Sequence, residues 1–429
     1  MDPRLIASRR DLLRMGLGAA ALGLLASPRG LPRLHADEAS PTVARPPGFG
    51  TARQVVFLYM IGGPSHFETF DPKPGTENGG PTRTVASALP GVHLADSLPL
   101  LARRMDRIAL VRSMTSKEGN HDRARYLVHS GYAPQPTVQH PGLGSILSHE
   151  KGKPDAELPE YVSVGGPGLG AGYLGVHHAP FVVLDPKQPI ANLDTPSGVD
   201  DRRRDARLEM LERMNEGFAR SRGEALPEAQ DAMFAKARRL MDSPRNVAFD
   251  ISKEPAGSAK PYGTTKFGLA CLQARRLIDA GVTCVEVMMN GWDTHDDGFA
   301  RCKALNGELD QGAAALLDDL KASGKLSETL VVWLGDFGRT PKITSTEGRG
   351  HYPKVWSAWF AGGGVQGGRV IGASTAGGDD VQARPVTIPD LFASLLHATG
   401  VENKLFHTNG RPITLHDKAG QPVPELFTA

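Results

Sequence analysis

The chain has 429 residues, enough for one large or two ordinary domains. Its 40% hydrophobic and 22% charged residues are typical of a soluble globular enzyme, and its 50 Gly and 33 Pro indicate many shaped loops rather than disorder. The formal charge of +2 comes from the first 36 residues, which hold six Arg and two Asp; the remainder carries about −2, so composition gives no case for a nucleic-acid partner.

Residues 1–36 have the pattern of a twin-arginine export signal. Ser8-Arg9-Arg10 precedes an apolar run over 15–26, and a small-residue cleavage site lies near Ala36. We therefore expect export by the twin-arginine machinery to a periplasmic or other extracytoplasmic location. The run is too short to span a bilayer comfortably, so no stable membrane span is expected in the mature form. A short amphipathic helix of the mature fold and an uncleaved membrane anchor are the alternatives.

Residues 37–50 are rich in Pro and Gly and are predicted to be a linker before a domain over 51–425. The near-continuous apolar stretch 55–59 predicts a buried strand of a parallel sheet. This strand runs into Gly62-Gly63-Pro64-Ser65-His66, where a Gly pair lets the backbone approach a ligand closely. The loop is predicted to border a site, with an ordinary Gly/Pro turn as the alternative.

A second strand is predicted at 108–111, followed by a helix from Asn120-His121-Asp122 to Gly131. The N-terminus of a helix offers free amide donors and the positive end of the dipole, both of which favour bound anions. This placement makes Asn120 and His121 candidates for contact with a substrate. The alternative for Asn120 is a simple helix cap.

The glycines between 165 and 175 follow a strand at 158–164 but match neither a phosphate-loop nor a dinucleotide pattern. Residues 200–241 carry Leu and Met at helical spacing among dense charge, which predicts two amphipathic helices. We interpret them as part of an insertion, at about 196–260, that covers or caps the sheet. Cys271 shares a helical face with apolar residues and is predicted to be a buried free thiol.

Two further strands deliver polar residues at their carboxyl ends. The apolar run 285–289 leads into Trp292-Asp293-Thr294-His295, and the run 330–334 leads into Gly335-Asp336-Phe337-Gly338-Arg339. Helices between the strands predict a mostly parallel sheet covered on both faces, which is a three-layer αβα sandwich. Ligands bind beyond the carboxyl ends of such strands, so these residues are predicted to meet at one edge of the sheet.

Asp293, His295, Asp336 and His351 are candidate metal ligands. Carboxylates and imidazoles suit hard or borderline divalent ions. Two more Asp crowd the loop that holds His295, and such crowding is costly without a cation. The alternative is a helix cap with a hydrogen-bonded His. Two arginines, Arg339 and Arg349, are predicted to neutralise an anionic substrate through paired hydrogen bonds.

Several segments together resemble one protein family. They are SRRDLLRMG, GGPSHFETFDPKPG, RSMTSKEGNHDRARYLVHSGY, GWDTHDDGF, GDFGRTP, GRGHYP and AGGGVQGGRVIG. Over nearly the whole chain they are similar to the exported bacterial family of domain of unknown function 1501, which looks like a divergent branch of the alkaline phosphatase and sulfatase superfamily. The segment DLFASLLHATGV is similar to the helix that closes that fold. The resemblance implies an alkaline-phosphatase-like fold and hydrolysis of phosphate or sulfate esters.

Within this resemblance, one metal of the superfamily would be held by Asp293, by His295 or Asp297, and by His351. A second metal would need an Asp after the first strand, where Ile61-Gly62-Gly63 stands instead. It would also need an Asp-His pair after a later strand.

That later pair is incomplete here, because Phe337 follows Asp336. The second metal would then depend on Asp336, helped by His66. No Cys-x-Pro-x-Arg sulfatase signature is present, and the alignment places His121 at the nucleophile position. Ser113 and Thr115 are alternative nucleophiles that lie several residues earlier.

We therefore expect an exported, metal-dependent hydrolase of phosphate or sulfate esters, with a small-molecule or polysaccharide ester as its substrate. In this hypothesis Asn120, His121 and Arg339 act on the ester, and the divalent metal is Zn, Mn, Ca or Mg. The predicted ligands are Asp293, His295, Asp336, His351 and His66. The alternative is a catalytically degenerate binding protein of the cell envelope on the same fold, whose corresponding side chains lie too far apart to share a cation.

Overall fold

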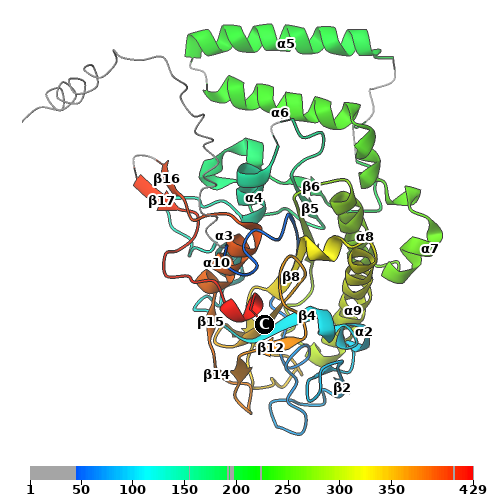
Figure 1. Ribbon diagram of the computed structural model, residues 1–429, viewed down its shortest axis with the longest axis vertical. Helices are drawn as coiled ribbons and strands as arrows, with labels where there is room; N and C mark the ends of the chain where they lie inside the picture. Colours follow the sequence, from blue (N-terminus) through cyan, green and yellow to red (C-terminus); the bar gives the residue numbers. More distant parts are fainter. Residues whose placement is uncertain are drawn as a thin grey trace, which may run out of the picture. The chain divides into compact units, whose positions relative to one another are not determined.

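A nine-stranded sheet forms the centre of the unit that begins at Pro46 (Figure 1). The computed structural model describes residues 45–153, 155–190, 193, 198–222, 225–408 and 411–428. The predicted export signal at 1–36 and residues 37–44 of the predicted linker lie outside the described residues.

The strands of this sheet follow the order β12-β4-β11-β8-β1-β7-β5-β6, and β15 also pairs with β4. Within the sheet, only β11 runs antiparallel to its neighbours, so the predicted mostly parallel sheet is confirmed. The strands are β1 Gln54–Met60, β4 Ile108–Thr115, β5 Tyr161–Val164, β6 Phe181–Val183, β7 Cys284–Met289, β8 Thr329–Gly335, β11 Trp356–Ala361, β12 Arg369–Ile371 and β15 Val386–Thr387.

Strand β1 lies between β7 and β8 and is buried on both faces, as its continuous apolar sequence predicts. Because side chains alternate along a strand, Val56 and Leu58 face one hydrophobic cluster while Phe57 and Tyr59 face the other. The sheet therefore separates two cores, each covered by its own helices.

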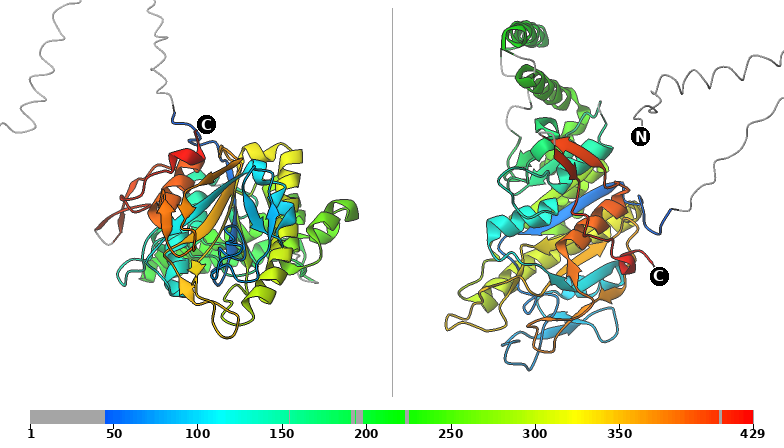
Figure 2. Two further views of the ribbon diagram at one scale, coloured as in Figure 1. Left: turned by 90° about the horizontal axis from the view of Figure 1, so that it is seen from below. Right: turned by 90° about the vertical axis from the view of Figure 1, so that its left-hand side faces the viewer.

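Helices cover both faces, which confirms the predicted three-layer sandwich (Figure 2). One face is covered by α8 (Lys266–Asp279) and α9 (Gly298–Ala322). The other is covered by α3 (His121–Ser130), α4 (Leu143–Lys151) and α10 (Ile388–Thr399). The predicted closing helix is α10, whose Thr387 and Asp390 form a capping box at its start and whose Gly400 ends it in a left-handed conformation.

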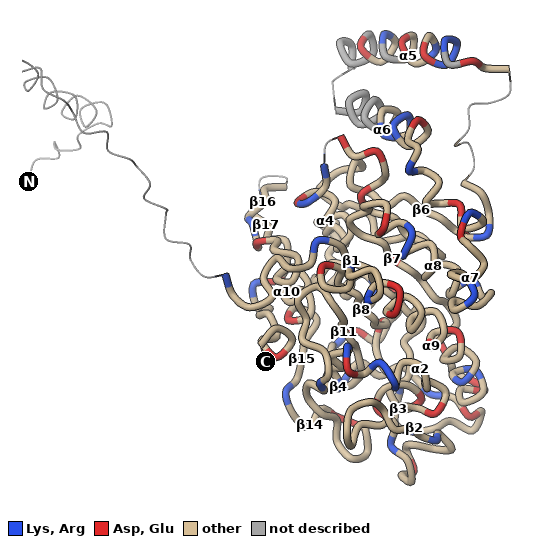
Figure 3. The backbone as a smooth tube through the Cα atoms, turned by 45° about the vertical axis from the view of Figure 1, so that its right-hand side comes forward, with Lys and Arg blue, Asp and Glu red and all other residues tan. Residues whose placement is uncertain are grey.

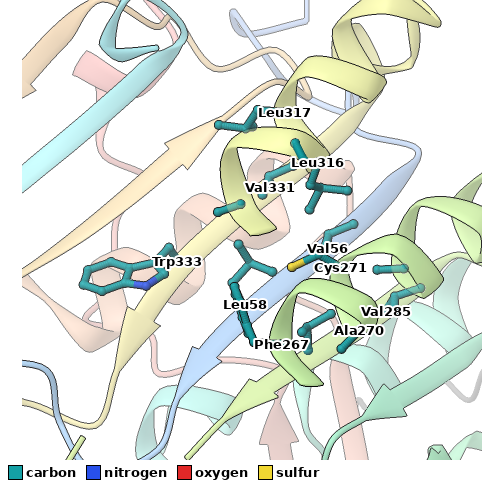
Figure 4. Packing of buried hydrophobic residues seen from close by; sticks show 14 of the residues in the cluster. Val56, Leu58, Phe267, Ala270, Cys271, Val285, Leu316, Leu317, Val331 and Trp333 are labelled. Carbon is teal, nitrogen blue, oxygen red and sulfur yellow. The ribbon is translucent and has the colours of Figure 1, made fainter. Parts of the chain in front are cut away.

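Cys271 packs inside the first core, beside Val56 of β1 and close to Leu316 and Leu317 of α9 (Figure 4). It is a buried free thiol, as predicted, and burial raises its pKa. Cys284 and Cys302 are also buried and free. None of the three is placed to act as a thiolate ligand or nucleophile.

The predicted amphipathic helices between 200 and 241 are α5 (Asp201–Arg222) and α6 (Ala225–Asp242). The two helices pack on each other, and α6 also contacts the short turn Val176–His178 that follows β5. Basic and acidic residues are interspersed along the described part of α5, as expected of a solvated surface (Figure 3).

Among the described residues, no helix is long and apolar enough to cross a bilayer. The remaining elements include the hairpin of β9 and β10, which borders the site described below. The remaining helices and strands are α2 Pro99–Ala102, α7 Ala256–Ala259, β2 Thr84–Ala86, β3 His93–Ala95, β9 Gly338–Arg339, β10 His351–Tyr352, β13 Ala373–Ser374, β14 Val381–Ala383, β16 Leu405–Thr408 and β17 Arg411–Thr414.

Candidate metal centre

The exits of β1, β7 and β8 lie side by side because the three strands are paired in register. Met60, the last residue of β1, pairs with Met289 of β7 and Gly335 of β8. The loops that leave these strands hold Gly62, Asp293 and Asp336. The predicted meeting of these segments at one edge of the sheet is confirmed.

Three ligand-type atoms converge beyond these strand ends. His121 Nε2 lies 3.3 Å from Asp293 Oδ1 and 3.0 Å from His351 Nε2, and His351 Nε2 lies 3.2 Å from Asp293 Oδ1. The structure thus joins two predicted metal ligands to His121, which the alignment places at the nucleophile position. All three separations are below the ~5 Å at which side chains no longer share one cation.

The orientation of both imidazoles is fixed by hydrogen bonds from their outer nitrogens. His121 Nδ1 lies 2.7 Å from Asp336 Oδ2, and His351 Nδ1 lies 2.8 Å from the Gly119 carbonyl oxygen. Both partners can accept a hydrogen bond from Nδ1, which leaves each Nε2 directed at Asp293 Oδ1. Two imidazole nitrogens and a carboxylate oxygen that also accepts from Arg339 thus face one another, an arrangement able to bind a cation.

The geometry of these three atoms fits a metal ion. His121, Asp293 and His351 would hold the ion, because separations of 3.0–3.3 Å between their ligand atoms are compatible with bonds of ~2.0–2.1 Å to one shared ion. Among the described residues, His121, Asp293 and His351 form a set whose ligand atoms lie within 4.8 Å of one another. Two nitrogens and one oxygen suit borderline ions such as Zn²⁺.

The charges around the cluster favour the ligand forms of its side chains. Burial raises the pKa of Asp293, but the hydrogen bond and positive charge of Arg339 outweigh it and hold that pKa well below its usual range. Burial, followed by the neighbouring His351, lowers the pKa of His121 and favours its neutral ring. A carboxylate and a neutral imidazole are the forms that bind a metal.

Asp336 lies behind the cluster rather than in it. Its Oδ1 accepts a short hydrogen bond from the Tyr59 hydroxyl, and its Oδ2 accepts from the Gly62 amide at 3.0 Å as well as from His121. Burial raises the pKa of Asp336 to about 7, although the Gly62 amide and the Arg339 charge oppose this rise. Both Asp336 oxygens are thus engaged by protein donors, and the structure does not place this predicted ligand among the three converging atoms.

His295 lies at the margin of the cluster. Its Nε2 is 2.9 Å from Asp293 Oδ1 and 3.0 Å from His351 Nε2, and 47% of its side chain is exposed. The loop that holds Thr346 and Gly348 fixes the His295 backbone, because the Thr346 hydroxyl donates to the His295 carbonyl and a Cβ on Gly348 would lie 1.7 Å from that oxygen. The side-chain distances place this predicted ligand next to the three converging atoms.

Arg339, which is predicted to hold a substrate anion, is fully buried. Its guanidinium donates to the carbonyls of Gly62, Gly63, Trp292 and Arg349, and to Asp293 Oδ1 at 2.5 Å. All three guanidinium nitrogens are thus used by protein acceptors. Arg339 instead ties together the loops after β1 and β7 and the hairpin that carries His351.

Tight packing at one glycine and one aromatic ring completes the site. A Cβ on Gly62, whose φ is +111°, would lie 2.3 Å from the Asp293 amide nitrogen, so only Gly permits this close approach. Phe337 is buried, with its ring centroid 4.8 Å from that of His121 and 4.9 Å from that of His351. Phe337 therefore forms an apolar wall against which both imidazole rings rest.

Two predicted site residues lie outside the cluster. Asn120 is the N-cap of α3 and accepts a hydrogen bond from the Arg123 amide at 3.2 Å, in agreement with the alternative interpretation. His66 is buried, and its Nε2 lies 2.9 Å from the Gly378 carbonyl oxygen. Because a carbonyl holds that nitrogen, the structure does not bring His66 to the metal position predicted for it.

Arg349 and Ser113 are likewise engaged elsewhere. Arg349 forms a buried ion pair with Glu68 at 2.8 Å and lies over the Phe67 ring, so it is not directed at a substrate. The Ser113 hydroxyl is buried and donates to the Arg384 carbonyl at 2.6 Å, which argues against its predicted use as a nucleophile.

The sequence motifs do not mark Tyr59 or the Gly119 carbonyl as parts of the site. Tyr59 could have been suspected of binding a polar group at the site, because a tyrosine inside a buried strand needs a partner for its hydroxyl. No residue type marks a carbonyl such as that of Gly119, and only the fold shows that it lies against His351.

The chain belongs to the family described as "Protein of unknown function (DUF1501)", whose model matches residues 52–427. No curated protein matches the sequence significantly.

Several solved structures are similar to this chain at low sequence identity. An alkaline phosphatase from the Antarctic bacterium TAB5 is 12% identical, with 82% of this chain and 98% of that chain covered and a TM-score of 0.36. The PsFucS1 sulfatase from Pseudoalteromonas sp. is 14% identical, with 82% and 68% covered and a TM-score of 0.40. The lipoteichoic acid synthase LtaP from Listeria monocytogenes is 9% identical, with 86% and 76% covered and a TM-score of 0.38. Any activity must therefore be argued from the residues of this chain.

Proposed function

We propose that this member of the DUF1501 family is an exported, metal-dependent hydrolase of phosphate or sulfate esters. The observation that carries the proposal is the convergence of three acceptor atoms, from His121, Asp293 and His351, at separations of 3.0–3.3 Å. Such a set is stabilised by a cation, and its open side leaves room for a substrate oxygen. The predicted export signal supports the proposed location, and the similarity of the sequence motifs to the alkaline phosphatase and sulfatase superfamily supports the proposed class of ester.

In this proposal His121, Asp293 and His351 would hold a divalent ion, with Zn²⁺ favoured by the two imidazoles. When bound, the ion would polarise an ester oxygen and make water a stronger nucleophile at neutral pH. Asp336 and Gly119 hold the two imidazoles in their metal-binding orientation, and Arg339 holds the loops that carry Asp293 and His351.

His295 is the exposed side chain nearest to this centre, within 3.0 Å of both Asp293 and His351. Its placement allows it to contact an ester bound at the open side or to complete the ligand set. Ser113, one of the alternative nucleophiles, is buried and donates its hydroxyl hydrogen bond to the Arg384 carbonyl. In this proposal water, rather than Ser113, attacks the ester.

The test combines metal analysis with catalysis. The purified chain, after incubation with Zn²⁺ or Mn²⁺ and removal of excess ion, is expected to retain one equivalent of metal and to hydrolyse an aryl phosphate or an aryl sulfate. His351→Ala should lose both properties. His93→Ala removes an exposed imidazole of β3 that does not belong to the cluster, and this variant should keep both properties. Metal-free protein without turnover, or equal metal binding by His351→Ala and the unsubstituted chain, would refute the proposal.

A further inference from the structure

Two hydrogen-bonded triads, each made of a tyrosine, a buried carboxylate and a histidine, hold the two ends of α3. In the first, Tyr59 of β1 donates to Asp336 after β8, and Asp336 accepts from His121 at the start of the helix. The second joins Tyr161 of β5, Glu286 of β7 and His129 in the last turn of α3. Tyr161 donates to Glu286 Oε2 at 2.5 Å, and His129 Nε2 lies 2.6 Å from Glu286 Oε1.

The two triads differ in what the second nitrogen of each histidine does. His129 Nδ1 lies 2.7 Å from the Arg125 carbonyl oxygen of its own helix, so both of its nitrogens are used inside the protein. His121 uses only Nδ1 in its triad, and its Nε2 is directed at Asp293 and His351. The first triad therefore leaves His121 Nε2 directed at the candidate metal centre. In the second triad both nitrogens of His129 have partners inside the protein.

We propose that Asp336 and Tyr59 are positioning residues of the metal centre, which set its metal affinity through His121 without contacting the ion. This inference rests on the proposed function, because it requires a metal at His121, Asp293 and His351. It assigns Asp336 a role different from that of the direct ligand that the sequence pattern suggests.

The assignment follows from what Asp336 controls. Its Oδ2 accepts the Nδ1 proton of His121, which keeps the proton off Nε2 and fixes the plane of the ring. Two further contacts fix Asp336 itself: the Gly62 amide holds Oδ2, and the Tyr59 hydroxyl holds Oδ1. The His121 ring itself also stacks on the Phe337 ring. Because Tyr59 and Asp336 are buried, water cannot easily replace either contact.

Loss of an outer-shell partner of this kind typically lowers metal affinity by ~10–100-fold. We expect the larger effect for Asp336→Asn, which removes the charge and leaves an amide group facing the Tyr59 hydroxyl or the Gly62 amide. Tyr59→Phe removes a single hydroxyl from a buried ring and should produce the smaller loss. Because its shape is conserved, this variant also remains informative if Asp336→Asn fails to fold.

The second triad supplies matched controls. Glu286→Gln and Tyr161→Phe make the same chemical changes to equally buried residues at the other end of α3. The affinity of each folded variant for Zn²⁺ alone is measured by competition with a chromophoric chelator. The visible spectrum of the Co²⁺-substituted protein then reports the ligand geometry, which a loss of stability alone would not change.

Asp336→Asn and Tyr59→Phe are expected to weaken Zn²⁺ binding and to alter the Co²⁺ spectrum, whereas the two control variants keep the affinity and spectrum of the unsubstituted chain. If the substitutions at Tyr59 and Asp336 behave like their controls, the inference is overturned while the metal centre stands. If the unsubstituted chain binds neither Zn²⁺ nor Co²⁺, the proposed function itself fails.

Discussion

The two ends of α3 show how a tyrosine, a carboxylate and a histidine can form either a closed structural network or part of a candidate metal site. Both ends use a tyrosine, a buried carboxylate and a histidine. At His129 the network closes on a backbone carbonyl, and only 4% of the side chain is exposed. At His121 the network stays open, and 29% of the side chain is exposed. A fully satisfied polar network rigidifies the core, whereas an open one presents a directed lone pair to a ligand.

The geometry of the helix relates the two ends. His121 and His129 are eight residues apart, which corresponds to roughly 12 Å along the helix axis. Asn120 caps the start of α3, and Gly131 ends it in a left-handed conformation with φ of +74°. Because both ends are fixed to the sheet, the position of His121 relative to Asp293 does not depend on the cap alone.

The largest expected effect comes from breaking the closed triad. Glu286→Leu would leave His129 buried without its acceptor and should lower the free energy of unfolding by about 3–5 kcal/mol. The matched change Asp336→Leu should cost less, about 1–3 kcal/mol, because the partly exposed His121 can turn to water. Denaturant unfolding of the metal-free variants measures both values. A larger loss of unfolding free energy in Asp336→Leu than in Glu286→Leu would contradict the view that the Glu286 triad is structural and the Asp336 triad belongs to the site.

An intermediate effect is expected at two glycines, one beside each triad. Gly62→Ala would place a Cβ 2.3 Å from the Asp293 amide at a φ of +111°. Such backbone strain should cost about 1–3 kcal/mol, and the displacement of Asp293 should weaken Zn²⁺ binding. Gly168→Ala would place a Cβ 2.3 Å from the Tyr161 hydroxyl, so it should lower stability alone. Thermal unfolding and Zn²⁺ titration distinguish the two, and unchanged Zn²⁺ affinity in Gly62→Ala would argue against this account.

The smallest effect is expected at the cap that precedes His121. Asn120→Ala should lower the free energy of unfolding by ~1 kcal/mol through loss of the N-cap, and Asn120→Asp should restore it. Neither change should alter the turnover number, because the Asn120 side chain is occupied by the Arg123 amide. Steady-state hydrolysis of the preferred aryl ester provides the measurement. A 100-fold loss of turnover in both variants would return Asn120 to the catalytic role that the sequence suggests.

The sequence predicts the scaffold better than the roles of individual residues. Apolar runs ending in Gly62, Asp293 and Asp336 indicate parallel strands with a shared edge, since that inference needs only periodicity and the rule for parallel sheets. Periodicity alone does not show whether a carboxylate at this edge faces a metal or accepts a hydrogen bond from a histidine, because rotation about one side-chain bond interchanges the two orientations. Asp336 illustrates the point: its place was predicted, but its orientation depends on Tyr59, 277 residues away in the chain.

The same limit explains the interpretation of Arg339. An arginine in a Gly-rich loop near acidic residues suggests an anion site, and the sequence does not reveal how many carbonyls will surround it. The structure places four backbone carbonyls and Asp293 around its guanidinium. With these acceptors around its guanidinium, Arg339 joins the loops that surround the site.

The most direct test of the central claim is an anomalous difference map from crystals of the Zn²⁺-treated chain, recorded above the zinc absorption edge. The account predicts one peak roughly 2.0–2.2 Å from His121 Nε2, His351 Nε2 and Asp293 Oδ1, with Asp336 outside coordinating distance. A peak bound directly by Asp336, or no peak among these three atoms, would contradict it.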